Sequence, residues 1–305
     1  MICFQNYLRS NDLTKHSLLI SITFNLFNIL LNAIFLYALD MDPILAVALG
    51  SIISRFIGVV LLFIIYKIKI NISISPKGLF PINFKEIKKL IGIGLPSAME
   101  SINYSLTQIV ILAIINIIGK NFEASAPISK TYASMIATIT YLFVNATSQG
   151  MQIILSRYLG AGEIELAKRL VVKTMITSII VSTIMAIMMA IFSEQIFGIF
   201  TNNKDVIKLC KYIMLVEIAL ELGRAVNMVL VRALQTSGDV MYPTILAIIC
   251  CWLIATLLSY ILGLRLEYGL VGIWIAMAMD ELIRACLFIV RFIRGKWLKI
   301  KIVNS

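Results

Sequence analysis

The chain has 305 residues, of which 60% are apolar and only 14% are charged. Soluble globular proteins contain about 45–50% apolar and 25% charged residues, so this composition excludes a water-soluble enzyme and indicates a protein whose solvent is lipid. The formal net charge of +11 would suggest nucleic acid in a soluble protein, but Lys and Arg also collect on the cytoplasmic side of membranes.

Eight apolar stretches are long enough to cross a bilayer core as helices, which takes roughly 20 residues each. They cover about residues 18–38, 44–66, 91–118, 132–155, 170–193, 212–231, 243–264 and 269–293. Backbone amides in lipid must be bonded within their own segment, and none of these runs alternates as a strand does. We therefore expect an all-α, polytopic transmembrane bundle of about eight spans, with the first span retained rather than cleaved.

The loops between these spans differ in charge. Eighteen Lys and Arg residues fall on one side and six on the other. The positive-inside rule then places both termini in the cytoplasm and the protein in the cell inner (plasma) membrane. Most of the positive charge is explained by this orientation, so we expect no nucleic-acid partner. The basic end of the chain, with Trp297 among its cations, is predicted to meet anionic lipid headgroups.

A basic segment divides the chain. Residues 67–90 contain turn residues and then an amphipathic pattern, which predicts a cytoplasmic helix lying on the membrane. Two helices precede this linker, in residues 1–66, and six follow it, in residues 91–297. Residues 298–305 form a basic cytoplasmic tail.

Ionisable residues at membrane depth cost several kcal/mol, so each needs a partner, water or a function. Glu100 lies about 13 Å into the third span, four residues after Pro96. Because Pro96 removes a backbone donor and polar residues surround it, this stretch is expected to line a cavity.

The sixth span carries three charges within eight residues. Glu217 and Glu221 share one helix face, and Arg224 follows three residues after Glu221. One interpretation is an intrahelical pair of Glu221 with Arg224 that leaves Glu217 over. The other is that one carboxylate exchanges its occupant, because burial and Arg224 shift its proton affinity in opposite directions.

The eighth span holds Asp280, Glu281 and Arg284 at helical spacing. We interpret this group as structural pairing within one turn. Arg55, in the second span, has no acid in reach along its own helix and must find a partner elsewhere.

Polar pairs and missing motifs complete the survey. Asn145 and Gln149, one turn apart in the fourth span, are candidates for a substrate cleft, although such pairs more often join helices. Phosphate-binding loops, a Ser/His/Asp set and paired Cys or His ligands do not occur in a sequence with the single histidine His16. We predict no enzymatic activity, no cofactor and no metal site apart from a coupling ion.

Four phrases in order resemble the multidrug and toxic compound extrusion (MATE) family of cation-coupled exporters. They are Phe4-Gln5-Asn6-Tyr7-Leu8-Arg9-Ser10; Gly94-Leu95-Pro96-Ser97-Ala98 with Glu100; Ser148-Gln149-Gly150 followed by Gly160-Ala161-Gly162-Glu163 and Ala167; and Arg232-Ala233-Leu234-Gln235 with Gly238-Asp239 and Pro243. The resemblance runs from about residue 4 to residue 297.

The resemblance implies twelve helices in two lobes. Here the first two helices correspond to the last two of an incomplete N-terminal lobe, and the last six correspond to the whole C-terminal lobe. By motif position, Glu100 and Glu221 take the place of the family's cation-coupling acids in that lobe. Their implied neighbours, which include a tyrosine and an asparagine, are Tyr104, Glu217, Arg224 and Asn227.

We therefore predict a secondary active transporter that exports drugs or other small amphiphilic or organic cationic substrates across the lipid bilayer in exchange for H⁺ or Na⁺. Two alternatives remain open. One is a non-transporting remnant or a subunit of a split transporter, whose missing helices come from another chain. The other is a lipid-linked oligosaccharide flippase of the same superfamily, in which Arg55 and Arg224 hold a diphosphate.

Overall fold

The computed structural model of the chain describes residues 2–69, 84–295 and 297, and it divides into two compact units, Met1–Asn83 and Phe84–Ser305. The boundary falls inside the predicted linker. Across the described residues the secondary structure is helical, which confirms the all-α prediction.

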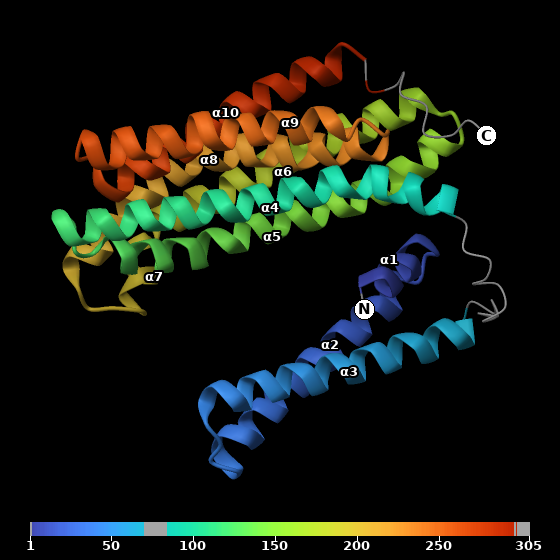
Figure 1. Ribbon diagram of the computed structural model, residues 1–305, viewed down its shortest axis with the longest axis horizontal. Coiled ribbons are helices and arrows are strands. Elements are labelled where there is room, and N and C mark those ends of the chain that lie inside the picture. The colour runs from blue at the N-terminus through green and yellow to red at the C-terminus, as the bar shows by residue number, and fades with distance from the viewer. Residues whose placement is uncertain (1, 70–83, 296, 298–305) are drawn as a thin grey trace. The chain divides into compact units, whose positions relative to one another are not determined.

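The first unit is a pair of long helices with a short one beside them (Figure 1). It comprises α1 (Ile2–Ser10), α2 (Thr14–Ala33), which continues as the π-helical turn η1 (Ile34–Ala38), and α3 (Pro43–Lys69). Polar and small residues join α2 to α3: the Asn28 amide donates to Ser51 and Ser54 at 3.3 Å each. Such interhelical hydrogen bonds are what membrane helices use in place of the hydrophobic effect.

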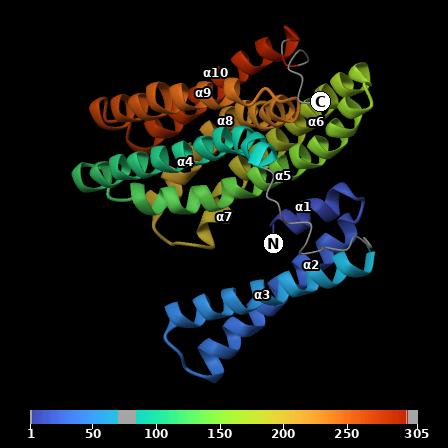
Figure 2. The same ribbon diagram turned by 45° about the vertical axis from the view of Figure 1, so that its right-hand side comes forward.

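The second unit is a bundle of long, roughly aligned helices (Figures 1 and 2). It comprises α4 (Phe84–Asn121), α5 (Ala126–Gly160), α6 (Ile164–Ile191), the short α7 (Ser193–Gly198), α8 (Lys204–Thr236), α9 (Met241–Cys250) with its π-helical continuations η3 (Cys251–Thr256) and η4 (Ser259–Arg265), and α10 (Gly269–Ile293). Helix α8 is central, because it packs against α5, α6 and α10.

Each of the eight predicted spans falls on a long helix. By length and composition, five helical segments in the described part of the chain can cross a membrane: Thr14–Ala38, Pro43–Lys69, Gly94–Asn121, Ile164–Ile191 and Met241–Arg265. The other three long helices are α5, α8 and α10. Helices α8 and α10 each carry a cluster of charged residues at the predicted membrane depth, whereas Glu100 on α4 and Arg55 on α3 are single charges there.

Helices α8 and α10 cross in close contact at Gly223. A Cβ atom at this position would lie 2.6 Å from the Glu281 carbonyl carbon and 2.7 Å from the Leu282 nitrogen. Only glycine lets the two backbones approach this closely, and small residues serve the same purpose at many membrane helix crossings. This contact places the charged turn of α8 beside the charged turn of α10.

Two features of the basic segments differ from the predictions. Residues 84–90 of the linker are the first two turns of α4, and residues 70–83 lie outside the described residues, as does the tail 298–305. The Trp297 side chain is only 1% exposed and stacks on Phe292, with ring centroids 5.1 Å apart. The prediction that Trp297 meets lipid headgroups is wrong, because the indole completes an apolar cluster at the end of α10 and donates to the Phe292 carbonyl at 3.0 Å.

Candidate functional site

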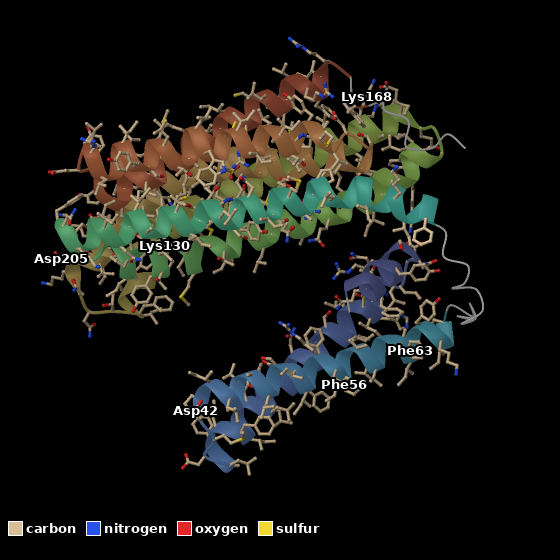
Figure 3. The ribbon with its side chains drawn as sticks, in the orientation of Figure 1. Asp42, Phe56, Phe63, Lys130, Lys168 and Asp205 are labelled. Atoms are coloured by element: carbon tan, nitrogen blue, oxygen red, sulfur yellow. The ribbon has the colours of Figure 1, made fainter. Side chains whose placement is uncertain are left out.

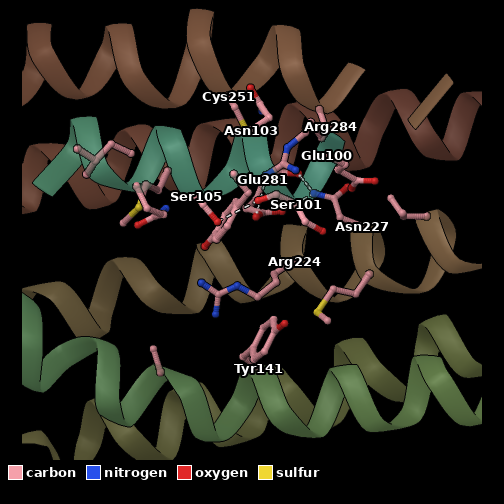
Figure 4. A pocket seen from close by; sticks show the side chains of 18 of the residues that line it. Glu100, Ser101, Asn103, Ser105, Tyr141, Arg224, Asn227, Cys251, Glu281 and Arg284 are labelled. Carbon is pink, nitrogen blue, oxygen red and sulfur yellow. Dashed lines mark hydrogen bonds and ion pairs between the residues drawn. The ribbon is translucent and has the colours of Figure 1, made fainter. Parts of the chain in front are cut away.

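The second unit contains a cavity of about 740 Å³ between α4, α5, α8, the α9–η3 junction and α10 (Figure 4). It extends along α4 from Ser97 to Ile115, which corresponds to about 27 Å of helix. Ionisable side chains line it from four helices: Glu100 and Tyr104 on α4, Lys130 and Tyr141 on α5, Glu217, Arg224 and Arg232 on α8, and Glu281 and Arg284 on α10.

The polar wall of α4 follows from the residues after Pro96. Ser101 donates to the carbonyl of Ser97 at 3.2 Å, and Ser105 donates to that of Ser101 at 3.0 Å. These serines satisfy their own hydroxyls within the helix, so the face they occupy tolerates both water and an apolar ligand. The stretch after Pro96 was expected to line a cavity, and Ser97, Glu100 and Ser101 do line this one.

Arg224 binds both acids of its own helix. Its Nη1 donates to Glu217 Oε1 at 3.0 Å and also to Glu221 Oε1. The second oxygen of Glu217 accepts a hydrogen bond of 2.7 Å from Trp274 Nε1 on α10. The sequence suggested that Glu217 would have no partner. It has two, because Trp274 on another helix donates to its second oxygen.

Glu221 is the less satisfied of the two acids. Its side chain is fully buried, and its Oε2 has no hydrogen-bond partner among the described residues. Glu221 lies behind the cavity wall, while its neighbours Glu217 and Arg224 line it. A buried carboxylate oxygen without a donor is costly unless it holds a proton or a cation.

The charged turn of α10 forms a second cluster. Arg284 Nη2 contacts Asp280 Oδ2 at 2.6 Å and Glu281 Oε1 at 2.8 Å, the pairing that the sequence suggested. Asn227 on α8 donates to both the carbonyl and the side chain of Glu281. Asp280 Oδ1 is buried without a partner in the described structure, which repeats the situation of Glu221.

Glu100 has a separate set of contacts. Its Oε2 accepts a hydrogen bond of 3.1 Å from Gln235 Nε2 near the end of α8. Arg232 and Arg284 lie within electrostatic range of its carboxylate. Gln235 is 14 residues beyond Glu221 on the same helix, which is about 21 Å along the axis. The structure therefore does not bring Glu100 and Glu221 into one site.

Three of the remaining predicted residues, Asn145, Gln149 and Arg55, do not line the cavity. Gln149 donates to Asn145 at 3.1 Å within α5, and neither residue lines the cavity. Arg55 is exposed on α3 in the first unit, and no acid pairs with it among the described residues. Tyr104 and Asn227 do line the cavity, and the acid that Asn227 contacts is Glu281 rather than Glu100 or Glu221.

Several wall residues could not be predicted from the sequence, and Trp274, Gln235 and Lys130 are the most informative of them. Trp274 and Gln235 each bond an acid far away in the sequence, which spacing along one helix cannot reveal. In the sequence, Lys130 is one of the loop cations from which the membrane orientation was predicted. In the structure it lines the cavity. The position of Lys130 within the first turns of α5, rather than in the loop before it, was the one feature of the sequence that pointed to the cavity.

Three buried acids and the partly buried Glu281 share two guanidinium groups across α8 and α10. We call these six residues the buried ionic network: Glu217, Glu221, Arg224, Asp280, Glu281 and Arg284. If all six were ionised, the network would carry two negative charges more than positive ones. Three or more His, Cys, Asp or Glu side chains able to hold a metal ion together do not occur among the described residues.

Comparison with known proteins decides the family. The family model described as MatE matches residues 96–261, which is more than half of the chain. The chain belongs to the MatE family. Its helical content and its membrane-spanning segments agree with this assignment.

Relatives and solved structures extend the match beyond those residues. The chain is 32% identical to the "Uncharacterized transporter YisQ" of Bacillus subtilis over 98% of its own length and 66% of the relative's. It is 24% identical to the "Probable multidrug resistance protein NorM" of Thermotoga maritima, over 98% of its own length and 64% of the relative's. A mutant of the Vibrio cholerae MATE transporter VcmN has the same fold, with a TM-score of 0.82 at 16% identity, over 97% of this chain and 67% of that one. The MatE-family chain thus spans slightly less than two thirds of these curated relatives.

Proposed function

We propose that this chain is the cation-binding and substrate-binding part of a MATE-type secondary transporter, which exports small amphipathic molecules in exchange for H⁺ or Na⁺. The named relatives are a transporter and a multidrug resistance protein, and both match along nearly the whole chain. The exported molecules are drugs or drug-like compounds, and the predicted organic cations are one class of them.

The observation that carries the proposal is the excess of acid in the buried ionic network. Glu221 Oε2 and Asp280 Oδ1 are buried carboxylate oxygens to which no described residue donates. Ionised carboxylates in a low-dielectric interior are unfavourable without counter-charge. The network is therefore expected to take up protons or a metal cation, which is the property that cation coupling requires.

The proposed mechanism is competition between two occupants. Glu221 exchanges its cation, while Glu217 and Arg224 connect its charge to the cavity wall. A cation in the network and a substrate in the cavity favour opposite-facing states, so binding of one shifts the population away from the other. Glu100 remains a second candidate for the coupling acid, at a separate position in the cavity.

The flippase alternative is not favoured by the structure. In that alternative Arg224 is one of the two residues that hold the diphosphate, yet Arg224 already contacts two carboxylates. An arginine neutralised by two acids presents no net positive charge to an anionic headgroup.

The test is efflux of a fluorescent amphiphile from vesicles that carry the chain, first under an imposed proton gradient and then under a sodium gradient. Glu221→Gln is expected to abolish gradient-driven efflux while insertion remains intact. Glu165→Gln, at an exposed acid of α6, is the matched control and should transport normally. Unchanged efflux in Glu221→Gln would refute the assignment.

A further inference from the structure

Some charged side chains of the cavity wall already have hydrogen-bond partners, and others do not. Both oxygens of Glu217 are occupied, by Arg224 and Trp274. Both oxygens of Glu281 are occupied as well, by Arg284 and Asn227. Each of these two acids is also paired with an arginine, which offsets its negative charge toward a positively charged ligand.

Glu100 is the remaining acid of the wall. One of its oxygens accepts from Gln235, and its charge lies within electrostatic range of Arg232 and Arg284. A single carboxylate oxygen thus remains uncommitted among the three acids that line the cavity.

Two cations of the wall have no such commitments. Arg232 on α8 and Lys130 on α5 both line the cavity and are half-buried. Neither side chain forms an ion pair or a hydrogen bond with any described residue. Arg232 lies within electrostatic range of Glu100 but donates no hydrogen bond to it. Arg232 offers five N–H donors and Lys130 offers three, and a half-buried cation attracts an anion more strongly than an exposed one.

These two cations lie toward opposite ends of the cavity. Lys130 lies near the same end of the unit as Asp205, in the first turn of α8 (Figure 3). Arg232 is 27 residues further along α8 than Asp205, or about 40 Å along its axis. Apolar and aromatic side chains line the wall between the two: Ile111, Ile115, Tyr141, Met228, Val231, Trp274 and Met277.

From this arrangement we infer that the cavity selects amphiphiles that carry an acidic group, and that Arg232 at one end of the cavity and Lys130 at the other each offer a position for that group. The planar guanidinium of Arg232 suits a carboxylate bound through two parallel hydrogen bonds, whereas Lys130 acts as a point charge. The apolar wall between them accepts the body of the molecule. The inference rests on the proposed function, and it names zwitterionic or anionic amphiphiles rather than simple organic cations as the favoured substrates.

The test uses three probes with the same aromatic body. A naphthalene carrying an acetate, an acetamide or an ethylammonium side chain is titrated against the purified full chain in neutral detergent, and binding is measured by calorimetry. We expect the acetate to bind about tenfold more tightly than the ammonium probe. The double variant Lys130→Gln with Arg232→Gln should lose that preference and leave the affinity for the acetamide unchanged. The two single variants then show which cation contributes more.

Lys208→Gln with Lys173→Gln is the matched control, since both lysines are exposed and lie outside this cavity. It should bind all three probes as the unmodified chain does. If the ammonium probe binds as tightly as the acetate or more tightly, or if the cavity variants leave the preference unchanged, the inferred substrate class is wrong while the proposed transporter stands. If none of the three probes binds, both the substrate class and the assignment of this cavity as the substrate site are overturned.

Discussion

Trp274 donates its indole N–H to Glu217 at 2.7 Å, and this contact joins α10 to α8 inside the buried ionic network. The two residues are 57 positions apart in the sequence. Because the indole fixes one oxygen of Glu217, the other oxygen faces Arg224. Arg224 then lies between Glu217 and Glu221, and the orientation of the whole α8 cluster depends on an uncharged residue of a neighbouring helix.

Trp274→Phe keeps the aromatic ring but removes the donor. Glu217 Oε2 would then be buried without a partner, which should lower the free energy of unfolding by about 1–3 kcal/mol. The measurement is thermal unfolding in detergent, followed by fluorescence of the remaining tryptophans. Tyr268→Phe is the control, because Tyr268 is 59% exposed and its hydroxyl forms no hydrogen bond with any described residue. Equal melting temperatures for the two variants would contradict this account of Trp274.

Gly223→Ala tests the close crossing of α8 and α10. The added Cβ would meet backbone atoms at 2.6 and 2.7 Å, so the helices must separate, with an expected loss of roughly 1–3 kcal/mol. Gly150→Ala on α5 is the matched control, since a Cβ there meets no atom within 4 Å. That control should gain up to about 1 kcal/mol from helix propensity. Thermal unfolding of both variants should therefore shift in opposite directions, and a shift in the same direction would refute the packing argument.

Asp239 and Arg291 connect the turn after α8 to the end of α10. Arg291 Nε donates to Asp239 Oδ2 at 2.8 Å, and its guanidinium lies 4.5 Å from the centre of the Tyr242 ring. Arg291→Met would leave the buried Asp239 carboxylate unpaired and is expected to cost about 3 kcal/mol or more. Arg294→Met, at an exposed position of the next turn, should change the unfolding temperature little. If both variants unfold at the same temperature, the ion pair does not stabilise this end of the bundle.

Glu123, in the loop between α4 and α5, gives a pH-dependent prediction. Its carboxylate accepts the backbone N–H of Leu270 at 2.8 Å at the start of α10. Burial raises the pKa of Glu123 above its ordinary value, and the Leu270 N–H opposes this in part. Because the folded state binds the proton more tightly than the unfolded state, the contribution of Glu123 to stability is complete below the ordinary carboxyl pKa and is lost as the pH rises through the raised pKa.

Glu123→Gln removes this titration and keeps an oxygen that accepts from Leu270. The unfolding temperature of the unmodified chain should therefore fall relative to that of the variant as the pH rises from about 4.5. Parallel pH profiles for the two proteins would show that Glu123 does not titrate differently in the folded and unfolded chain.

Local patterns in the sequence predicted most of the fold. The eight long helices follow from the length of the apolar runs, and the pairs of Arg224 with Glu221 and of Arg284 with Asp280 follow from spacing on one helix. Contacts between distant segments could not be predicted in this way. Gln235 meets Glu100 across 135 residues, and only the packing of α4 against α5, α9 and α10 brings them together.

The sequence also could not distinguish two uses of positive charge. Lys130 and Arg232 were counted with the loop cations that set orientation, because a residue near the end of a span fits that role equally well. Whether these two side chains point into the cavity depends on the rotation of α5 and α8 about their axes, which the sequence does not give. The position of Glu221 within an apolar span, and its place in the family motif, made it a candidate, while the identity of its unpaired oxygen required the three-dimensional structure.

The central claim is that the buried ionic network holds an exchangeable cation through Glu221. Its most direct test has two arms on the purified full chain: a Na⁺ titration at constant pH that records bound ²²Na⁺, and an acid titration without Na⁺ that compares the protons taken up with those taken up by Glu221→Gln. The account predicts that saturable Na⁺ binding or Na⁺-independent proton uptake occurs in the unmodified chain and in Glu165→Gln and is absent from Glu221→Gln. Equal cation binding by the unmodified chain and Glu221→Gln would contradict it.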